Sequence, residues 1–183
     1  MNIEDIEYSH ILGVSTIETL GGENKRMEVV EVDGENFVLV EDVGEDYPGA
    51  NPVKKNLLNI PKKLAEVDVN APKAVKVGSV VVMEYVDGEQ LLFTDRDYDE
   101  EEFKRVAGAM LGTGNADASR LNILVDSDNE LWAVDHDRAG VTKWDVVVRD
   151  FKEITRMGQT PGLDESIGND ILDYGRQYWD EFR

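Results

Sequence analysis

The order of its local patterns is the feature that most constrains this chain: strand-like segments come first and helical periodicity follows. The first half holds short Val-rich runs separated by turn residues, and the Asp33-Gly34 pair is a strong signal for a hairpin between two of them. The second half carries apolar residues at helical spacing. This order indicates an α+β fold, in which a small antiparallel sheet precedes a mainly helical part.

The same patterns predict individual elements. The expected strands are 14–20, 27–32, 36–40, 74–77, 79–86, 123–125 and 131–134. The expected helices are 52–58, 99–112, 142–158 and a last one from Asp164 toward Phe182. Pro61 should break the first of these helices, or restart it before Leu64, because proline lacks the N–H that a helix interior needs.

Composition excludes several classes of protein. Of 183 residues, 41% are hydrophobic and 8% are aromatic, which is enough to bury the core of one domain or of two small lobes around a cleft. The absence of Cys excludes disulfides, thiolate zinc sites and thiol catalysis. No apolar run approaches the roughly 18 residues of a membrane span, and the N-terminus lacks the pattern of a signal peptide. We therefore expect a soluble protein of the cytoplasm, or of a viral particle.

Acidic residues dominate the charge. With 39 acidic and 19 basic side chains the net charge is −20, and no basic run is longer than a pair such as Lys54-Lys55 or Lys62-Lys63. Such a surface repels the phosphates of nucleic acids, so we expect no nucleic-acid partner. Two explanations of the excess acid remain open. One is a halophilic surface suited to high salt, and the other is a magnesium-using protein whose partners are basic.

Three polar residues around one expected hairpin carry the chemistry. Asp117 lies in the loop before the 123–125 strand, Asn122 immediately precedes that strand, and Asp135 follows the return strand. An acid on the loop, an amide five residues later and a second acid after the return strand can all point into one cleft. Carboxylate and amide oxygens are ligands that suit Mg²⁺.

This stretch resembles the kinase-like superfamily, whose catalytic loop reads H-x-D-x-x-x-x-N and whose metal-binding acid lies at the end of the next hairpin strand. The likeness is closer to phosphatidylinositol-kinase-like and persistence-toxin-type kinases, in which the loop reads N-x-D-x-x-x-x-N-x-L and the second acid lies in an I-D-H-G context. Residues 115–117 and 134–136 fit that version. The resemblance implies two lobes: a β-rich lobe over 1–88 that ends in a hinge, and a helical lobe over 89–183.

The resemblance also implies ATP and magnesium as ligands. Asp117 would orient or deprotonate an acceptor hydroxyl, while Asn122 and Asp135 would hold Mg²⁺ on the phosphates. Residues 80–88 look like the fifth strand and hinge that face adenine, and residues 17–26 resemble the loop that covers the phosphates. The nucleotide-binding residues implied in this way are Gly21, Gly22, Lys25, Arg26, Glu84 and Val86.

The sequence departs from the kinase pattern at the phosphate clamp. Val40 stands where the third strand should carry a Lys, with Glu41 beside it, and the next helix offers Lys54 and Lys55 where a Glu is usual. A reversed pair between Glu41 and one of these lysines would be the corresponding swap, and Lys25 or Arg26 would be a replacement cation. Asp137 adds negative charge where a Gly usually follows, which disfavours nucleotide unless metal neutralises it.

Three hypotheses remain. The first is an ATP- and magnesium-binding phosphotransferase that acts on a small-molecule or protein hydroxyl. The second is a catalytically silent pseudokinase that binds a partner protein, or serves as a structural part of a larger assembly such as a viral particle. The third is an acidic α+β protein unrelated to kinases, in which Asp117 and Asp135 would lie far apart.

Overall fold

The computed structural model describes residues 1–20, 25–43, 53–156 and 163–183, and it confirms the expected α+β fold. An antiparallel five-stranded sheet has the spatial order β1-β2-β3-β5-β4, and a three-stranded antiparallel sheet has the order β6-β7-β8. The strands are β1 (Thr16–Leu20), β2 (Lys25–Val32), β3 (Glu35–Val43), β4 (Ala74–Val77), β5 (Val80–Glu84), β6 (Gly88–Gln90), β7 (Ile123–Asp126) and β8 (Leu131–Ala133). The helices are η1 (Ile3–Asp5), α1 (Tyr8–Ile11), α2 (Val53–Ala65), α3 (Glu100–Gly112), α4 (Trp144–Thr155) and α5 (Glu165–Glu181).

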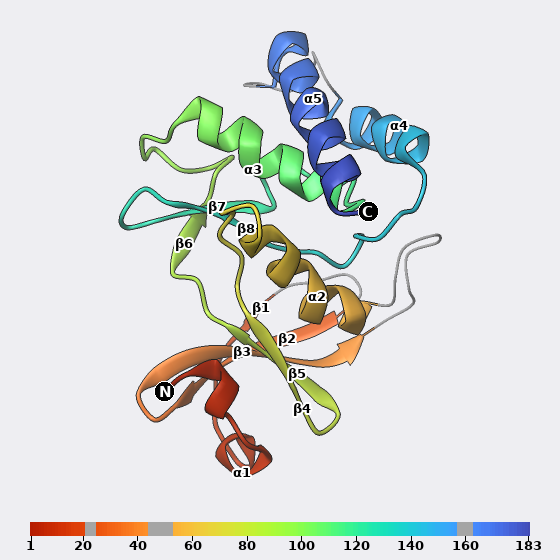
Figure 1. Cartoon of the computed structure of the whole chain (residues 1–183). Helices are drawn as coiled ribbons and strands as arrows, with labels where there is room; N and C mark the ends of the chain where they lie inside the picture. Colours follow the sequence, from red (N-terminus) through yellow and green to blue (C-terminus); the bar gives the residue numbers. More distant parts are fainter. Residues whose placement is uncertain (21–24, 44–52, 157–162) are drawn as a thin grey trace.

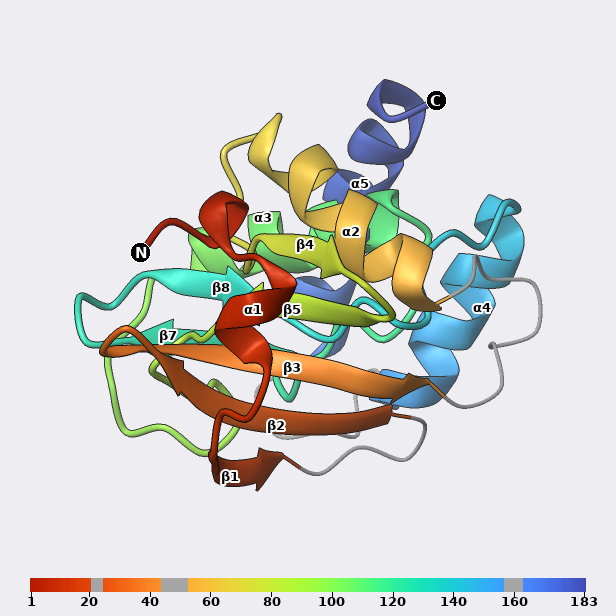
Figure 2. The ribbon, with the colours of Figure 1, turned by 90° about the horizontal axis from the view of Figure 1, so that it is seen from below.

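The large sheet lies at one end of the molecule, helices α3, α4 and α5 lie at the other, and α2 lies between them (Figure 1). Alternation along β3 gives the sheet two apolar faces. Phe37 and Leu39 pack with Ile3 on one face, which the N-terminal segment covers (Figure 2). Val38 and Val40 pack on the other face. The centre of the sheet, at β3 and β5, is therefore buried on both sides, while β1 at its edge is mostly exposed. Helix α2 covers the inner face, on which Val38 and Val40 lie.

Helix α2 belongs to both halves of the molecule. Its first turns place Val53 and Leu57 in the cluster with the inner face of the sheet, whereas Ile60 and Leu64 join the larger core of the C-terminal half. The expectation that Pro61 breaks this helix is wrong, because α2 continues through Pro61 to Ala65. A proline in a helix costs one backbone hydrogen bond, but here Pro61 is buried on the helix's apolar face, and this packing offsets the loss.

Glycines allow α3 and α5 to cross closely. A Cβ atom built on Gly108 would lie 2.4 Å from the Cβ of Tyr174, and one built on Gly112 would lie 2.4 Å from the Cβ of Tyr178. Real side chains do not approach so closely, so the contact exists only because both positions lack a side chain. This crossing fixes the end of α3 from which the candidate catalytic loop begins.

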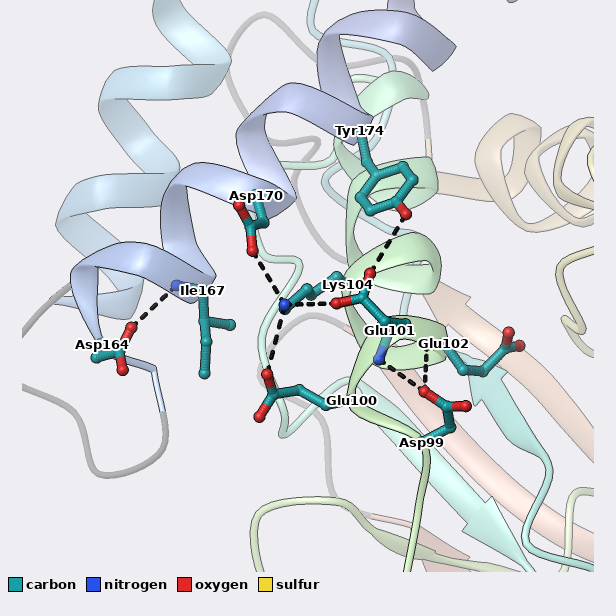
Figure 3. Close-up of polar contacts among 9 residues, drawn as sticks. All are labelled: Asp99, Glu100, Glu101, Glu102, Lys104, Asp164, Ile167, Asp170 and Tyr174. Carbon is teal, nitrogen blue, oxygen red and sulfur yellow. Dashed lines mark hydrogen bonds and ion pairs between the residues drawn. The ribbon is translucent and has the colours of Figure 1, made fainter.

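An ion-pair cluster joins the start of α3 to α5 (Figure 3). The nearly buried Lys104 ammonium lies 2.7 Å from a carboxylate oxygen of Glu101, 2.9 Å from one of Asp170 and 3.4 Å from one of Glu100. Hydrogen bonds to Glu101 and Asp170 hold the pKa of Lys104 above its ordinary value, although desolvation opposes them. The acids at the first turn of α3 therefore do more than complement the helix dipole, since they also flank the Lys104 ammonium, whose ion pair with Asp170 joins α3 to α5.

Helix starts follow the sequence signals in two cases and depart from them in a third. A side-chain oxygen of Asp99 accepts hydrogen bonds from the Glu101 and Glu102 N–H groups, and Asp164 caps α5 in the same manner. The prediction that the 142–158 helix begins at Thr142 is wrong, since α4 starts after Lys143, which makes no side-chain cap. The predicted end of that helix at 157–158 lies outside the described residues. Within the described residues, no helix is both long and apolar enough to span a bilayer.

Candidate active site

Four hydrogen bonds close a circuit between the loop after α3 and the segment after β8. The Asn115 side chain accepts from the Asp117 N–H at 3.1 Å and donates to the Asp135 carbonyl at 3.3 Å. The Asn122 side-chain amide donates to the Asp117 carbonyl at 2.9 Å, and the Val134 N–H donates to the Asn122 carbonyl at 2.9 Å. The predicted trio of Asp117, Asn122 and Asp135 is therefore held in one place by neighbouring backbone and by the fully buried Asn115.

The backbone at Asp135 is unusual. Its φ is +58°, in the left-handed region that most residues avoid and that Asp and Asn tolerate best. His136, which follows it, is 1% exposed, and its Nε2 atom lies 3.1 Å from the Ala133 carbonyl oxygen. The turn after β8 is thus fixed by a buried ring, which presents the Asp135 side chain from a defined point.

Burial is the largest influence on the Asp117 carboxyl, and it raises the pKa of Asp117 above the ordinary value of 3.8. The nearby negative charge of Asp135 raises that pKa further, while the Arg138 charge and hydrogen bonds from Asn122 and Ser119 oppose the rise. A carboxylate with a raised pKa is a stronger base than an exposed one, which suits proton abstraction from a hydroxyl.

Two residues near the site were missed by sequence reasoning. Arg138 places a guanidinium nitrogen 3.6 Å from an Asp117 carboxylate oxygen. Asn56, which is 1% exposed in α2, donates from its side-chain amide to the Asp137 carbonyl at 3.0 Å and to the Ala139 carbonyl at 2.8 Å. One feature of the sequence could have pointed to Arg138: it lies only three positions after Asp135, which was itself predicted to lie in the site. Asn56 had none, since it lies 81 residues from Asp137 in the sequence.

The residues predicted to bind nucleotide are only partly described. Gly21 and Gly22 lie outside the described residues, as do the side chains of Lys25 and Arg26, whose backbone belongs to β2. The Glu84 N–H donates to the Lys73 carbonyl at 2.9 Å, and a Glu84 carboxylate oxygen accepts from the Lys73 N–H at 2.8 Å. The Val86 carbonyl accepts a hydrogen bond from the N–H of Gly88 at 3.1 Å, and Gly88 is the first residue of β6.

Neither Lys54 nor Lys55 of α2 takes the place of the phosphate-binding Lys that β3 lacks. Val40 is fully buried against that helix, so β3 presents no cation at the expected position. The Lys54 ammonium donates to the Ser79 carbonyl at 2.9 Å, in the turn between β4 and β5. Lys55 lines a groove with Gly140 and Phe182 instead of the site around Asp117. The predicted swap with Glu41 involves a side chain outside the described residues.

The residues present fit a magnesium ion that is carried by a nucleotide. In the described part of the chain no three acidic or His side chains gather as a metal cage. Mg²⁺ commonly takes only one or two protein ligands and fills its remaining positions with water and phosphate oxygens. Because the Asn122 amide nitrogen already donates to the Asp117 carbonyl, the Asn122 side-chain oxygen is the atom that would face a metal, and Asp135 would be the charged ligand.

Replacing Asp117 with Asn is expected to stabilise the protein at neutral pH. A raised folded-state pKa means that the ionised Asp117 carboxylate opposes folding, and this cost grows as the pH rises above 3.8. The melting temperature of Asp117→Asn, relative to the native chain, should therefore increase from pH 4 to pH 7. Asp128→Asn, in an exposed turn, controls for the loss of one negative charge. An equal gain in both variants would contradict the assigned burial effect.

The fold is similar to solved kinase-like structures. The Rio2 kinase of Chaetomium thermophilum, in an ADP/Mg²⁺-phosphoaspartate complex, aligns with a TM-score of 0.52 and 13% identity over 93% of this chain and 73% of its own. WaaP in complex with acyl carrier protein aligns at 0.56 and 15% over 90% and 79%. A pseudokinase in its apo form aligns at 0.53 and 11% over 96% and 88%.

No protein-family model matches the sequence, and no curated protein matches it significantly. None of these structural likenesses bears on salt adaptation or on a viral origin. Identities of 11–15% carry the fold and not the activity. The chain has a protein kinase-like fold.

Proposed function

We propose that this chain binds ATP with magnesium through Asn122 and Asp135 and transfers the γ-phosphoryl group to an acceptor hydroxyl. In this step ADP leaves and Asp117 takes the proton of the hydroxyl. The observation that carries the proposal is the closed hydrogen-bond circuit that gathers these three residues on a kinase-like fold. The N-x-D-x-x-x-x-N-x-L pattern of residues 115–124 supports the phosphatidylinositol-kinase-like or persistence-toxin-type variety. The acceptor is a small molecule or a docked protein.

Each residue has a role in keeping with its surroundings. Asp117, with its raised pKa, accepts the proton of the acceptor hydroxyl. Asn122 and Asp135 orient the phosphates, and bound magnesium would supply charge neutralisation there. Arg138 restrains the Asp117 carboxylate and offsets part of the negative charge that Asp135 and Asp137 place near the phosphates.

A second candidate is a silent kinase fold that binds a partner. Two observations favour it: buried Val40 occupies the place of the clamping Lys, and α2 carries Asn56 and lysines but no acid. Loss of a phosphate-clamping cation removes electrostatic stabilisation of the transferred group, which commonly costs several powers of ten in rate. A pseudokinase with this site would bind nucleotide without turnover, or bind none.

Thermal unfolding with Mg-ATP distinguishes these cases. A ligand present at 100 times its Kd stabilises by about 2.7 kcal/mol, which in a domain of this size is a rise of roughly 5–10 °C in melting temperature. We expect such a rise for the native chain, dependent on magnesium and lost in Asp135→Asn. Asn is preferred to Ala at this position because it tolerates the φ of +58°.

Three outcomes separate the candidates. Asp128→Asn should keep the full rise, since Asp128 lies in the exposed turn between β7 and β8. A magnesium-dependent rise together with ATP turnover that Asp117→Asn abolishes supports the phosphotransferase. A rise without turnover supports a nucleotide-binding pseudokinase. No rise at millimolar Mg-ATP in low or high salt overturns the nucleotide site and leaves a binding module.

A further inference from the structure

A groove of about 570 Å³ lies between α2, the end of α3, the 140–142 segment and the C-terminal residues. Four of its lining side chains are cationic, namely Lys55, Lys62, Lys63 and Arg183, and none is acidic. The chain has 39 acidic and only 19 basic residues, so a lining whose charged side chains are all basic is the opposite of the chain's overall charge. The groove shares Asn56 with the surroundings of the candidate site, but Asp117, Asn122 and Asp135 do not line it, and nothing in this inference rests on the proposed function.

Helix geometry directs the α2 cations to one face. Lys55, Asn59, Lys62 and Lys63 follow one another at spacings of four, three and one, which places them along one side of the helix. Cations in the last turn of a helix are favoured by the helix dipole, which accounts for Lys62 and Lys63. Lys55 lies in the first turn, where the dipole disfavours a cation, so its position there needs another explanation.

Two of the four cations are already held in place. The Lys63 ammonium donates to the Phe182 carbonyl at 3.4 Å and lies 5.8 Å from the centre of that ring. The Arg183 guanidinium donates to the Val141 carbonyl at 3.2 Å and lies 3.5 Å from the centre of the Trp179 ring. An ammonium has three donors and a guanidinium has five, so both groups keep donors for a ligand. The site is therefore partly preorganised, which lowers the entropic cost of binding.

We propose that this groove binds a compact polyanion that carries two or more phosphate groups. Its volume lies within the range of about 300–1,000 Å³ that is typical of small-molecule sites. Lys62 lies seven positions after Lys55, which is about 10 Å along a helix, so we expect no single phosphate to contact both ammonium groups. A chain of phosphates, or a scaffold that bears several, spans that distance and joins α2 to Arg183.

The net charge of −20 does not forbid such a ligand. At physiological ionic strength the Debye length is about 8 Å, so acids on distant faces are largely screened from the groove. The local field of the four cations that line the groove then dominates at short range.

Isothermal titration calorimetry with inorganic tripolyphosphate tests the proposal. The titration is run at fixed ionic strength with EDTA and without magnesium, so that a metal-dependent nucleotide site contributes nothing. We expect saturable binding to the native chain, and a loss of affinity of about tenfold or more in the Lys55→Gln/Lys62→Gln variant, because two charge-assisted contacts are removed. The control Lys76→Gln/Lys152→Gln removes the same charge at exposed positions outside the groove and should change affinity by less than about twofold.

Other outcomes would overturn the proposal. They are no heat at millimolar tripolyphosphate, an equal loss in both double variants, or sulfate binding as tightly as tripolyphosphate. Because the tripolyphosphate titration contains neither magnesium nor ATP, a negative result would contradict the groove proposal alone and would leave the proposed function untouched. Far-UV circular dichroism and the melting temperature verify that each variant is folded.

Discussion

Gly108→Ala and Gly112→Ala are each expected to lower the free energy of unfolding by about 3 kcal/mol or more. An added Cβ would lie 2.4 Å from the Cβ of Tyr174 or Tyr178, both fixed to the backbone of α5, so the two helices must separate. In a domain of this size the loss is a fall of roughly 6–12 °C in melting temperature. Urea denaturation followed by circular dichroism measures the change directly.

The direction of this result is diagnostic. In a helix that packs against nothing, Gly to Ala stabilises by about 1 kcal/mol, so helix propensity predicts the opposite sign. Gln177→Ala, at an exposed position on α5, is the control and should be near neutral. A neutral or stabilised Gly108→Ala would show that α3 and α5 do not cross as closely as these distances require.

Asn56→Ala is expected to cost about 2–3 kcal/mol, because the buried carbonyl oxygen of Ala139 and the partly buried carbonyl oxygen of Asp137 lose their donor. Asn59→Ala is the matched control, since Asn59 lies on the same helix but is exposed. Chemical denaturation gives the comparison. If the nucleotide site is as proposed, Asn56→Ala should also weaken the Mg-ATP shift, because the segment that follows Asp135 loses its attachment to α2. Equal stability of the two variants would contradict a structural role for Asn56.

Much of the fold was predictable because its signals are local. Strand β4 and the hairpin at Asp33-Gly34 follow from β-branched residues and turn chemistry, and the starts of α3 and α5 follow from Asp99 and Asp164. The short strand β6 was missed, because Gly88–Gln90 has no strand propensity and forms only by pairing with β7. The prediction that Pro61 breaks its helix was wrong for a related reason, since the packing of α2 outweighs the local helix-breaking tendency of proline.

Part of the candidate site could likewise be predicted from the sequence, and part could not. The spacing of Asp117 and Asn122 within one loop was visible in the sequence, and the return strand brought Asp135 beside them. The ion pair of Arg138 and the hydrogen bonds of Asn56 depend on how the chain turns after β8 and where α2 lies. The convergence of Lys55 and Arg183 on one groove likewise joins distant segments. Contacts of this kind leave no periodic signal in the chain.

The sharing of α2 between two cores bears on whether either lobe can exist alone. A chain divided between residues 88 and 89 would leave Ile60, Leu64 and Val69 on one fragment, and the core into which they pack on the other. The first fragment would expose these side chains to water, and the second would carry a cavity where they belong. We therefore expect residues 1–88 and 89–183 to fold only together, as one cooperative unit, and neither fragment to be usable as a separate module.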